Sequence, residues 1–320
     1  LPYVARPPQV VPVSARRFLI KRAVWFVLGV LAVVTLTFLF VALTPDPNRA
    51  AVLWGGGEKA LSAYAAAKNQ NMPLLDRYVI WLERLATLDL GSAAQTVGPS
   101  HGPSVLDEIG DALGTTALYA VPGILAATAV GVALGTISGL KPNSWADSVV
   151  RGVSYFGLGV PHFYIAGFLW VYVGLFKYGA PDWVRYTGAS GVLAITLLAA
   201  QTRYTRAEIR EFAGTDFIKL VKAKGASPLR IARHLLRNAA LPLLTLFVAE
   251  LLSVLVITSV VVEKAFRISG IGSLAFLAMK QRDMPVIIGV VLVVSVIGIV
   301  GTFLQDVLYT VLDPRIGFDE

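Results

Sequence analysis

Cysteine is absent from all 320 residues, and charged side chains make up only 15% of the chain. Without a thiol there is no disulfide framework, no cysteine nucleophile and no thiolate metal site, so the redox compartment cannot be inferred. A soluble domain of ordinary composition carries about 25% charged residues. The scarcity of charge therefore excludes an ordinary soluble domain.

Catalytic signatures are missing as well. The sequence has no G-x-x-x-x-G-K-[ST] loop, so the chain cannot bind ATP in the P-loop manner. It also lacks an H-E-x-x-H motif, a G-x-S-x-G motif and a pair of carboxylates at catalytic spacing. We therefore predict that the chain is not an enzyme and has no catalytic residues, no metal ligands and no cofactor of its own.

Apolar sequence dominates instead. Hydrophobic residues make up 56% of the chain, and the mean hydropathy is +0.68. Apolar segments of about 18 residues or more recur, which predicts an all-α polytopic membrane protein. The net charge of +8 does not indicate a nucleic-acid partner, because the basic residues cluster beside the apolar segments as the positive-inside rule requires.

We predict six transmembrane helices. Residues 1–17 form a basic cytoplasmic tail, residues 18–43 the first span, and residues 44–111 a long polar insertion on the outer side. The first apolar run is too long for a cleavable signal peptide. Residues 112–320 form a five-helix core, and the even number of spans leaves both termini inside. Its spans are placed near 112–140, 149–178, 190 onward, 239–262 and 285–312.

Two of these spans have an unusual composition. Gly131 and Gly135 in the second span form a G-x-x-x-G pair, which lets helices approach closely in lipid. The fourth span has only about a dozen apolar residues between Ser190 and Arg203, too few for a helix surrounded by lipid. We therefore predict that it lies inside the bundle and continues into the cytoplasm.

The strongest positive-inside signal lies between residues 203 and 237, which contain nine Lys or Arg residues and only three acidic residues. The segment 214–242 overlaps this region and predicts two short helices that meet at Gly225. Glycine readily adopts the left-handed conformation that ends a helix. Thr215 is the expected N-cap of the first helix and Ser227 that of the second. The second helix has a cationic stripe (Arg230, Arg233, Arg237) and an apolar stripe (Leu229, Ala232, Leu236). An ordinary amphipathic loop between two spans has these features too.

The order of residues in this loop resembles the cytoplasmic "EAA" loop of ABC-transporter permeases. The similarity rests on Ala223-Lys224-Gly225, on the basic helix, and on Arg237-Asn238-Ala239-Ala240-Leu241-Pro242. Lys219-Leu220-Val221 stands where the consensus has Glu-Ala-Ala, and the gap to Pro242 is long. Both departures are usual in the dipeptide/oligopeptide/nickel family, whose first, B-type permease the chain most resembles. Asp89-Leu90-Gly91 and Asp313-Pro314-Arg315 are also shared with that family.

This resemblance implies a type I ABC-importer permease fold in a prokaryotic cytoplasmic membrane. The implied partners are a second homologous permease, two ATPase subunits that bind ATP and Mg²⁺, and an external substrate-binding protein. The loop would couple this chain to an ATPase subunit. The candidate coupling residues are Phe217, Leu220, Ala223, Lys224, Gly225, Ser227, Leu229, Arg230 and Arg233.

Candidate residues for the translocation path or an outer gate lie elsewhere. A charged Glu250 in the fifth span is energetically costly in lipid, so its side chain must face the bundle or a water-filled cavity. That position is consistent with a role in the solute path and equally with a structural role. Residues 263–285 resemble the family's re-entrant segment, with Phe266 as a candidate gate and with Gly270 and Gly272 permitting tight turns. His162 is either a proton relay or a structural hydrogen-bonding residue.

Two other classes of function compete with an ATP-driven peptide importer. A secondary transporter would need broken helices in symmetry-related halves and buried ion ligands, and no inverted repeat is visible. A membrane scaffold or receptor would not need a glycine-hinged docking loop. Within the importer class, nickel chelates and oligosaccharides are alternative substrates to di- and oligopeptides.

Overall fold

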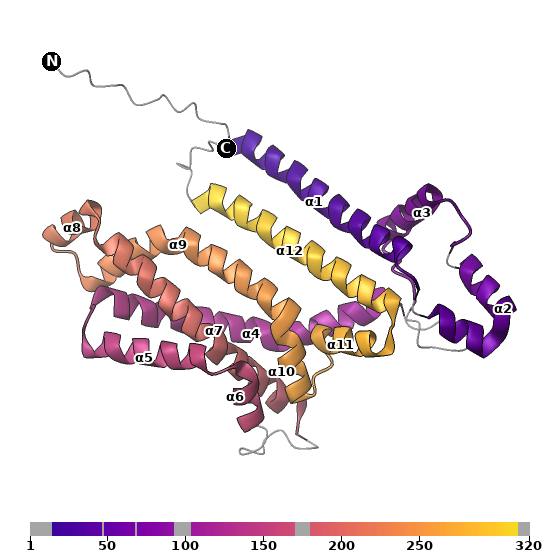
Figure 1. Cartoon of the computed structure of the whole chain (residues 1–320). Helices are drawn as coiled ribbons and strands as arrows, with labels where there is room; N and C mark the ends of the chain where they lie inside the picture. The colour runs from indigo at the N-terminus through magenta and orange to yellow at the C-terminus, as the bar shows by residue number, and fades with distance from the viewer. Residues whose placement is uncertain (1–14, 47, 68, 93–103, 170–179, 313–320) are drawn as a thin grey trace.

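The computed structural model describes residues 15–46, 48–67, 69–92, 104–169 and 180–312 (Figure 1). Within these residues it contains twelve α-helices and one π-helical segment, which confirms the all-α class. The predicted tail up to residue 14, the end of the third span over 170–179, and Asp313-Pro314-Arg315 lie outside the described residues. Five of the described helices are long and apolar enough to cross a membrane.

Helices α1 (Ala15–Leu43) and α12 (Met284–Leu312) form an antiparallel pair along one edge of the bundle (Figure 1). The rings of Phe26 and Phe303 lie 5.3 Å apart. Near the start of α1, Arg22 Nε lies 3.3 Å from Asp306 Oδ2. The first and last spans of the chain therefore begin and end at the same side of the bundle.

Helices α4 (Val105–Leu140) and α7 (Asp182–Ala213) form the centre of the molecule and run parallel. Three glycines of α4 lie against α7 so closely that no side chain fits. A Cβ on Gly131 would lie 2.6 Å from Gln201 Cβ, and one on Gly135 would lie 2.6 Å from Thr205 Cβ. Gly139 continues the series one turn later. The close approach predicted from the G-x-x-x-G pair is confirmed.

The fourth predicted span is longer than its apolar run suggests. Helix α7 begins at Asp182 and runs without interruption to Ala213. Trp183 and Tyr186, which precede the fourth span predicted from residue 190 onward, are therefore in the first two turns of α7. Polar positions such as Gln201, Thr202 and Thr205 are buried against α4, so packing inside the bundle replaces the missing apolar residues.

The third predicted span is broken in its described part. Helix α5 (Trp145–Gly159) ends before Pro161, and α6 (His162–Phe168) begins after it. Proline has no N–H and disfavours helical backbone in the residue before it, which explains the break. Neither short helix is long enough to span a membrane, so the described residues contain five candidate spans rather than the six predicted.

The basic loop also differs in outline from its prediction. Helix α8 (Asp216–Ala223) is short, as expected, but the second helix does not end near Pro242. It continues as α9 (Pro228–Ser253) through that proline into the fifth span. A π-helical segment (Val254–Thr258), α10 (Ser259–Phe266) and α11 (Ile271–Gln281) follow it. The loop is therefore one short helix joined to the extended start of a span.

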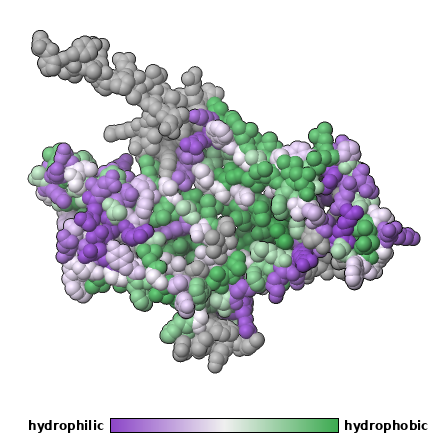
Figure 2. All heavy atoms as spheres, viewed as in Figure 1, coloured by the Kyte–Doolittle hydropathy of each residue, from purple (hydrophilic) through white to green (hydrophobic). Residues whose placement is uncertain are grey.

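Helices α2 (Arg49–Ala67) and α3 (Leu74–Ala86) belong to the predicted insertion and lie at the end of the bundle opposite α8 (Figure 1). The last residues assigned to that insertion are already helical, because α4 begins at Val105. Hydrophilic residues gather at the α8 end and at the α2–α3 end, with hydrophobic residues between them (Figure 2). This is the distribution expected of a bilayer-spanning bundle.

Candidate functional site

The basic elbow (residues 214–242) turns at Gly225, whose φ of 72° lies in the left-handed region. The Gly225 N–H donates to the Lys222 carbonyl at 2.9 Å, and the Ala226 N–H donates to Val221 at 3.4 Å. These two bonds satisfy the last carbonyls of α8 in the pattern of a Schellman motif. The predicted role of Gly225 in ending the helix is confirmed.

The two predicted N-caps behave differently. The Ser227 hydroxyl accepts from the Arg230 N–H at 3.4 Å and caps α9. Thr215 occupies the N-cap position of α8, but its hydroxyl donates to the Phe212 carbonyl at 2.7 Å instead of capping. The predicted Thr215 cap is therefore wrong. The hydroxyl bonds instead to the end of the preceding helix, at a Phe212 carbonyl that also accepts from the Thr215 N–H at 3.1 Å.

The elbow has its own small hydrophobic core. Ile218 of α8 packs with Ile231 and Leu235 of α9 and with Ile209 of α7. Of the predicted apolar stripe, Leu236 packs against this core, whereas Leu229 is exposed. The Phe217 and His234 rings meet edge to face at 5.7 Å and add a second contact between α8 and α9. The elbow is held as a folded unit rather than as a loose loop.

All the residues proposed for coupling lie on the outside of this unit. Each of them is exposed, from Phe217 on α8 to Arg233 on α9. The apolar side chains are notable among them: Leu229 is 81% exposed, Leu220 55% and Phe217 50%. Such side chains at a hydrophilic end of the molecule, flanked by Lys and Arg, suit insertion into an apolar groove of another protein.

Behind the elbow lies a buried ion-pair group, the Asp147 cluster, made by Asp147, Arg206 and Ser138. The Asp147 carboxylate, with no exposed area, accepts from Arg206 Nε at 2.7 Å and Nη2 at 3.0 Å. Ser138 Oγ also donates to it, as does the Asn143 N–H at 2.9 Å. The Arg206 hydrogen bonds hold the pKa of the Asp147 carboxyl well below its usual range. The cluster ties α4, α5 and α7 together beside α8.

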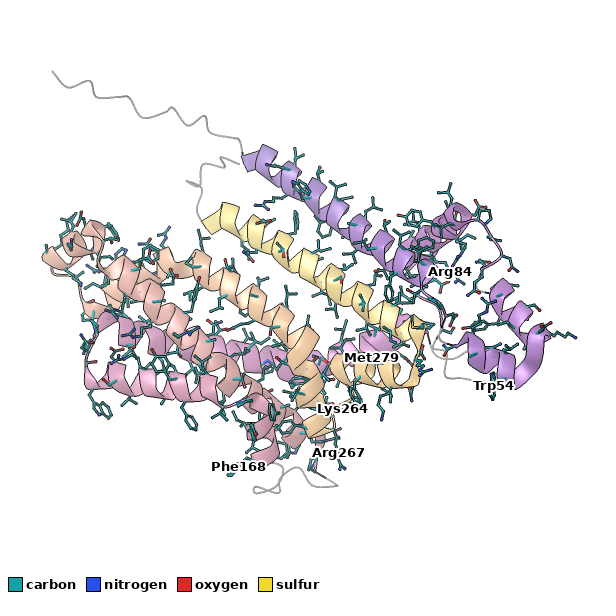
Figure 3. The ribbon with its side chains drawn as sticks, viewed as in Figure 1. Trp54, Arg84, Phe168, Lys264, Arg267 and Met279 are labelled. Atoms are coloured by element: carbon teal, nitrogen blue, oxygen red, sulfur yellow. The ribbon has the colours of Figure 1, made fainter. Side chains whose placement is uncertain are left out.

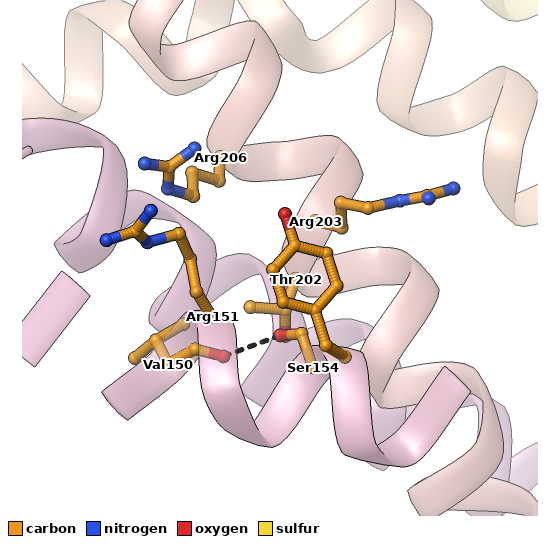
Figure 4. Close-up of a pocket in the computed structure, with 7 residues that line it drawn as sticks. Val150, Arg151, Ser154, Thr202, Arg203 and Arg206 are labelled. Carbon is orange, nitrogen blue, oxygen red and sulfur yellow. Dashed lines mark hydrogen bonds between the residues drawn. The ribbon is translucent and has the colours of Figure 1, made fainter. Parts of the chain in front are cut away.

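A small pocket between α5 and α7 adjoins this cluster (Figure 4). Arg151 and Arg206 extend to one side of it and Arg203 to the other (Figure 4). Ser154 Oγ donates to the Val150 carbonyl at 2.8 Å along its wall. The pocket combines three arginines with largely apolar walls.

Within the bundle, Glu250 is buried and accepts a hydrogen bond from Gln201 Nε2 at 2.5 Å. Oε1 of each side chain has no hydrogen-bond partner in the part of the chain that the structure describes. The expectation that Glu250 faces the bundle is confirmed, and its partner is a buried amide of α7. His162 begins α6, but its side chain lies outside the described residues.

Another buried carboxylate, that of Glu263 on α10, links this helix to α4 and α11. Its Oε1 accepts from Thr116 Oγ1 at 2.7 Å and from the Tyr119 hydroxyl at 3.1 Å, and its Oε2 accepts from the Ser273 N–H at 2.7 Å. The Ile271 N–H donates to Thr116 Oγ1 at 2.9 Å. Burial raises the pKa of the Glu263 carboxyl above its ordinary value. We call this group the Glu263 network.

The predicted gate residues surround this network. Gly270 and Gly272 are needed for close approach rather than for turns, because φ at Gly270 is −101°. A Cβ on Gly270 would lie 2.3 Å from Glu263 Oε1, and one on Gly272 would lie 2.3 Å from the Val260 nitrogen. Phe266 is 2% exposed and packs in the hydrophobic core with Val262 and Ile268. In this arrangement Phe266 is a core residue.

Neither Asp147 nor Glu263 was identified as a buried carboxylate from sequence. For Asp147 a local signal existed, since the Ser144 hydroxyl accepts from the Asp147 N–H at 3.2 Å in a helix-capping pattern. For Glu263 there was no local signal in the sequence, because its hydrogen-bond partner Thr116 lies 147 residues away. Among the described residues, no group of three or more His, Asp or Glu is placed to hold a metal ion.

A helical membrane bundle with an exposed basic elbow is the architecture of a transport permease subunit. Residues 131–318 match the family described as "binding-protein-dependent transport system inner membrane component". The chain is 32% identical to the dipeptide transport system permease protein of Bacillus subtilis, over 94% of this chain and 97% of the relative. It is 31% identical to the glutathione transport system permease protein of Pectobacterium atrosepticum, over 94% and 99%. A putative peptide permease protein of Brucella ovis is 29% identical, over 89% and 94%.

The chain therefore belongs to the binding-protein-dependent transport system inner membrane component family. It is an integral membrane permease subunit of an ABC importer and not a catalytic enzyme. Proteins of this family work with ATPase and substrate-binding partners. This assignment confirms the resemblance drawn from the basic elbow.

Proposed function

We propose that this chain forms half of the translocation pathway of an ATP-driven importer for di- or oligopeptides. The relatives named as dipeptide, glutathione and peptide permeases support this substrate class over nickel chelates and oligosaccharides. A second homologous permease completes the pathway, two ATPase subunits bind ATP and Mg²⁺, and an external binding protein delivers the peptide. No observation favours an ion-gradient mechanism.

The topology that we propose has six spans in a prokaryotic cytoplasmic membrane, in a type I importer fold. The third span runs from residue 149 in α5 through α6 to residue 178, and residues 44–111 form mainly an outer insertion. The α8 end is cytoplasmic, together with both termini. The density of Lys and Arg between 203 and 237 supports this orientation.

The proposal that the basic elbow couples this chain to an ATPase subunit rests on the exposed surface of the elbow. Its buried residues hold α8 against α9, while Phe217, Leu220 and Leu229 point away from that core. Such a rigid knob transmits movement of an ATPase subunit to α9 as a rigid-body shift. Lys224, Arg230 and Arg233 would position it through charge-assisted hydrogen bonds. A solute-path role for Glu250, His162, Phe266, Gly270 and Gly272 stays a prediction.

The test is reconstitution with the partner subunits in proteoliposomes, measuring ATP hydrolysis and uptake of a labelled dipeptide together. Gly225→Pro removes the N–H that bonds Lys222 and cannot adopt a φ of 72°. Ala223→Glu places a charge on the exposed surface. Both are expected to lower peptide uptake per ATP hydrolysed by about 5-fold or more.

Ala63→Glu is the matched control, because Ala63 is an exposed helical alanine at the opposite end of the molecule. It should leave the coupling ratio unchanged. Normal coupling in both elbow variants would contradict the docking role. Uptake that follows a proton or sodium gradient without nucleotide would contradict the importer mechanism itself.

A further inference from the structure

Helix α3 packs against the side of the first span rather than standing clear of the bundle (Figure 1). The Tyr78 hydroxyl is hydrogen-bonded to Thr35 Oγ1 at 2.7 Å. The Phe38 ring lies 5.1 Å from that of Tyr78 and 6.3 Å from that of Trp81. The contact therefore joins one face of α3 to the last turns of α1.

The position of these contacts along α1 sets the depth of α3. Thr35 lies eight residues before Leu43, the end of the apolar first span. At ~1.5 Å per residue this is about 12 Å inside the end of the helix. A helix that contacts α1 this far inside its apolar segment lies at the membrane and not in bulk water.

Other apolar residues of α3 form a stripe that is exposed at Leu75 and Val79 and partly buried at Leu82. Leu75, Val79 and Leu82 recur at i, i+4 and i+7, and Leu75 is 71% exposed. Arg77 and Arg84 lie on the opposite side of the helix, since 100° per residue places Arg84 half a turn from Leu75. Arg84 pairs with Asp89 at 3.3 Å, and Figure 3 labels it at the α2–α3 end of the molecule.

Lipid covers this stripe more readily than a protein would, because the stripe continues an apolar surface already at the membrane. Leu36, Phe40 and Leu43 of α1 are all exposed beside the α3 contact. A helix with one strongly apolar face and a charged opposite face is the type that lies in the plane of a bilayer surface. No residue of α3 is buried within the chain.

We propose that α3 is an interfacial helix whose Leu75–Val79–Leu82 stripe is immersed in the acyl boundary of the leaflet at the α2–α3 end. In the proposed topology this is the outer leaflet. The insertion is then anchored to the membrane by α3. The immersion itself does not depend on the transport activity or its substrate.

The absence of cysteine makes a direct depth measurement possible without altering the background. Single Leu75→Cys and Arg84→Cys variants of the full chain would carry a nitroxide label in phosphatidylcholine nanodiscs. Collision rates with oxygen, which partitions into lipid, and with a water-soluble nickel chelate would be compared. The Leu75 position should show several-fold higher oxygen access and several-fold lower nickel access than Arg84. Val79→Cys repeats the test if Leu75→Cys does not fold.

Equal, water-like collision rates at Leu75 and Arg84 would overturn the proposal. So would nickel access at Leu75 that disappears only when the external binding protein is added, because the stripe would then be a protein-docking surface. A membrane-immersed Leu75 in a chain that shows no peptide uptake would leave the anchor standing and contradict only the proposed function.

Discussion

Two of the buried carboxylates, those of Asp147 and Glu263, are hydrogen-bonded to opposite halves of α4 and are stabilised in different ways. Asp147 is paired with a guanidinium that is itself mostly buried. Glu263 is held by two hydroxyls and a backbone N–H. A buried charge without a partner is costly, so each needs its network, but only the first keeps its charge through an opposite charge. The Asp147 carboxylate near the elbow is therefore stabilised by an opposite charge, and the Glu263 carboxyl is stabilised by hydrogen bonds from uncharged groups.

The largest expected effect comes from breaking the Asp147 cluster. Asp147→Ala leaves Arg206 buried without its carboxylate, and removing one partner of a buried ion pair costs about 3–5 kcal/mol. Thermal unfolding of the purified protein in detergent would measure the loss. Asp182→Ala removes an exposed pair with Arg185 and should cost about 0–1 kcal/mol.

A double variant sharpens this result. Asp147→Leu with Arg206→Met removes both charges, so it should recover much of the stability lost in Asp147→Ala. If the double variant is as unstable as the single one, the pair's electrostatics are not what holds the elbow end together.

A smaller effect is expected at the Glu263 network. Glu263→Ala leaves the Thr116 and Tyr119 hydroxyls and the Ser273 N–H without their acceptor. Leaving such buried groups unsatisfied should lower the free energy of unfolding by about 1–3 kcal/mol after relaxation. Glu263→Gln keeps an acceptor oxygen and should lose less. Unfolding free energies for the two variants provide the measurement, and an equal loss in both would contradict the hydrogen-bond account.

The smallest effect is a difference in pH dependence between the two carboxyl groups. The folded pKa of Glu263 is raised above its ordinary 4.5, so its contribution to stability is greatest below pH 4.5 and is lost as the pH rises through the raised value. Asp147 has a lowered pKa, so its contribution is constant above about pH 4. Acidification toward pH 4.5 should raise the melting temperature by a few degrees at most, and by less in Glu263→Gln. If the melting temperature of Glu263→Gln depends on pH as that of the unmodified protein does, another group causes the pH dependence.

Local patterns predicted much of the elbow but not its packing. Gly225 and Ser227 act through neighbours within four residues, so their roles followed from the sequence. Thr215 failed as a cap because the end of α7 competes for its hydroxyl. The extent of α7 was missed because Gln201 and Thr205 are buried against glycines of α4, a contact between segments about 70 residues apart.

By itself the sequence determined the class of the protein, its membrane location and the family, because long apolar runs, clustered basic residues and the elbow motif are local features. Only the tertiary structure decided which polar groups meet: Asp147 with Arg206, Glu263 with Thr116, and Tyr78 with Thr35. Those pairs join distant segments, and their partners are selected by helix packing and by the cost of burying a polar group alone. That cost leaves no trace in the spacing of residues along the chain.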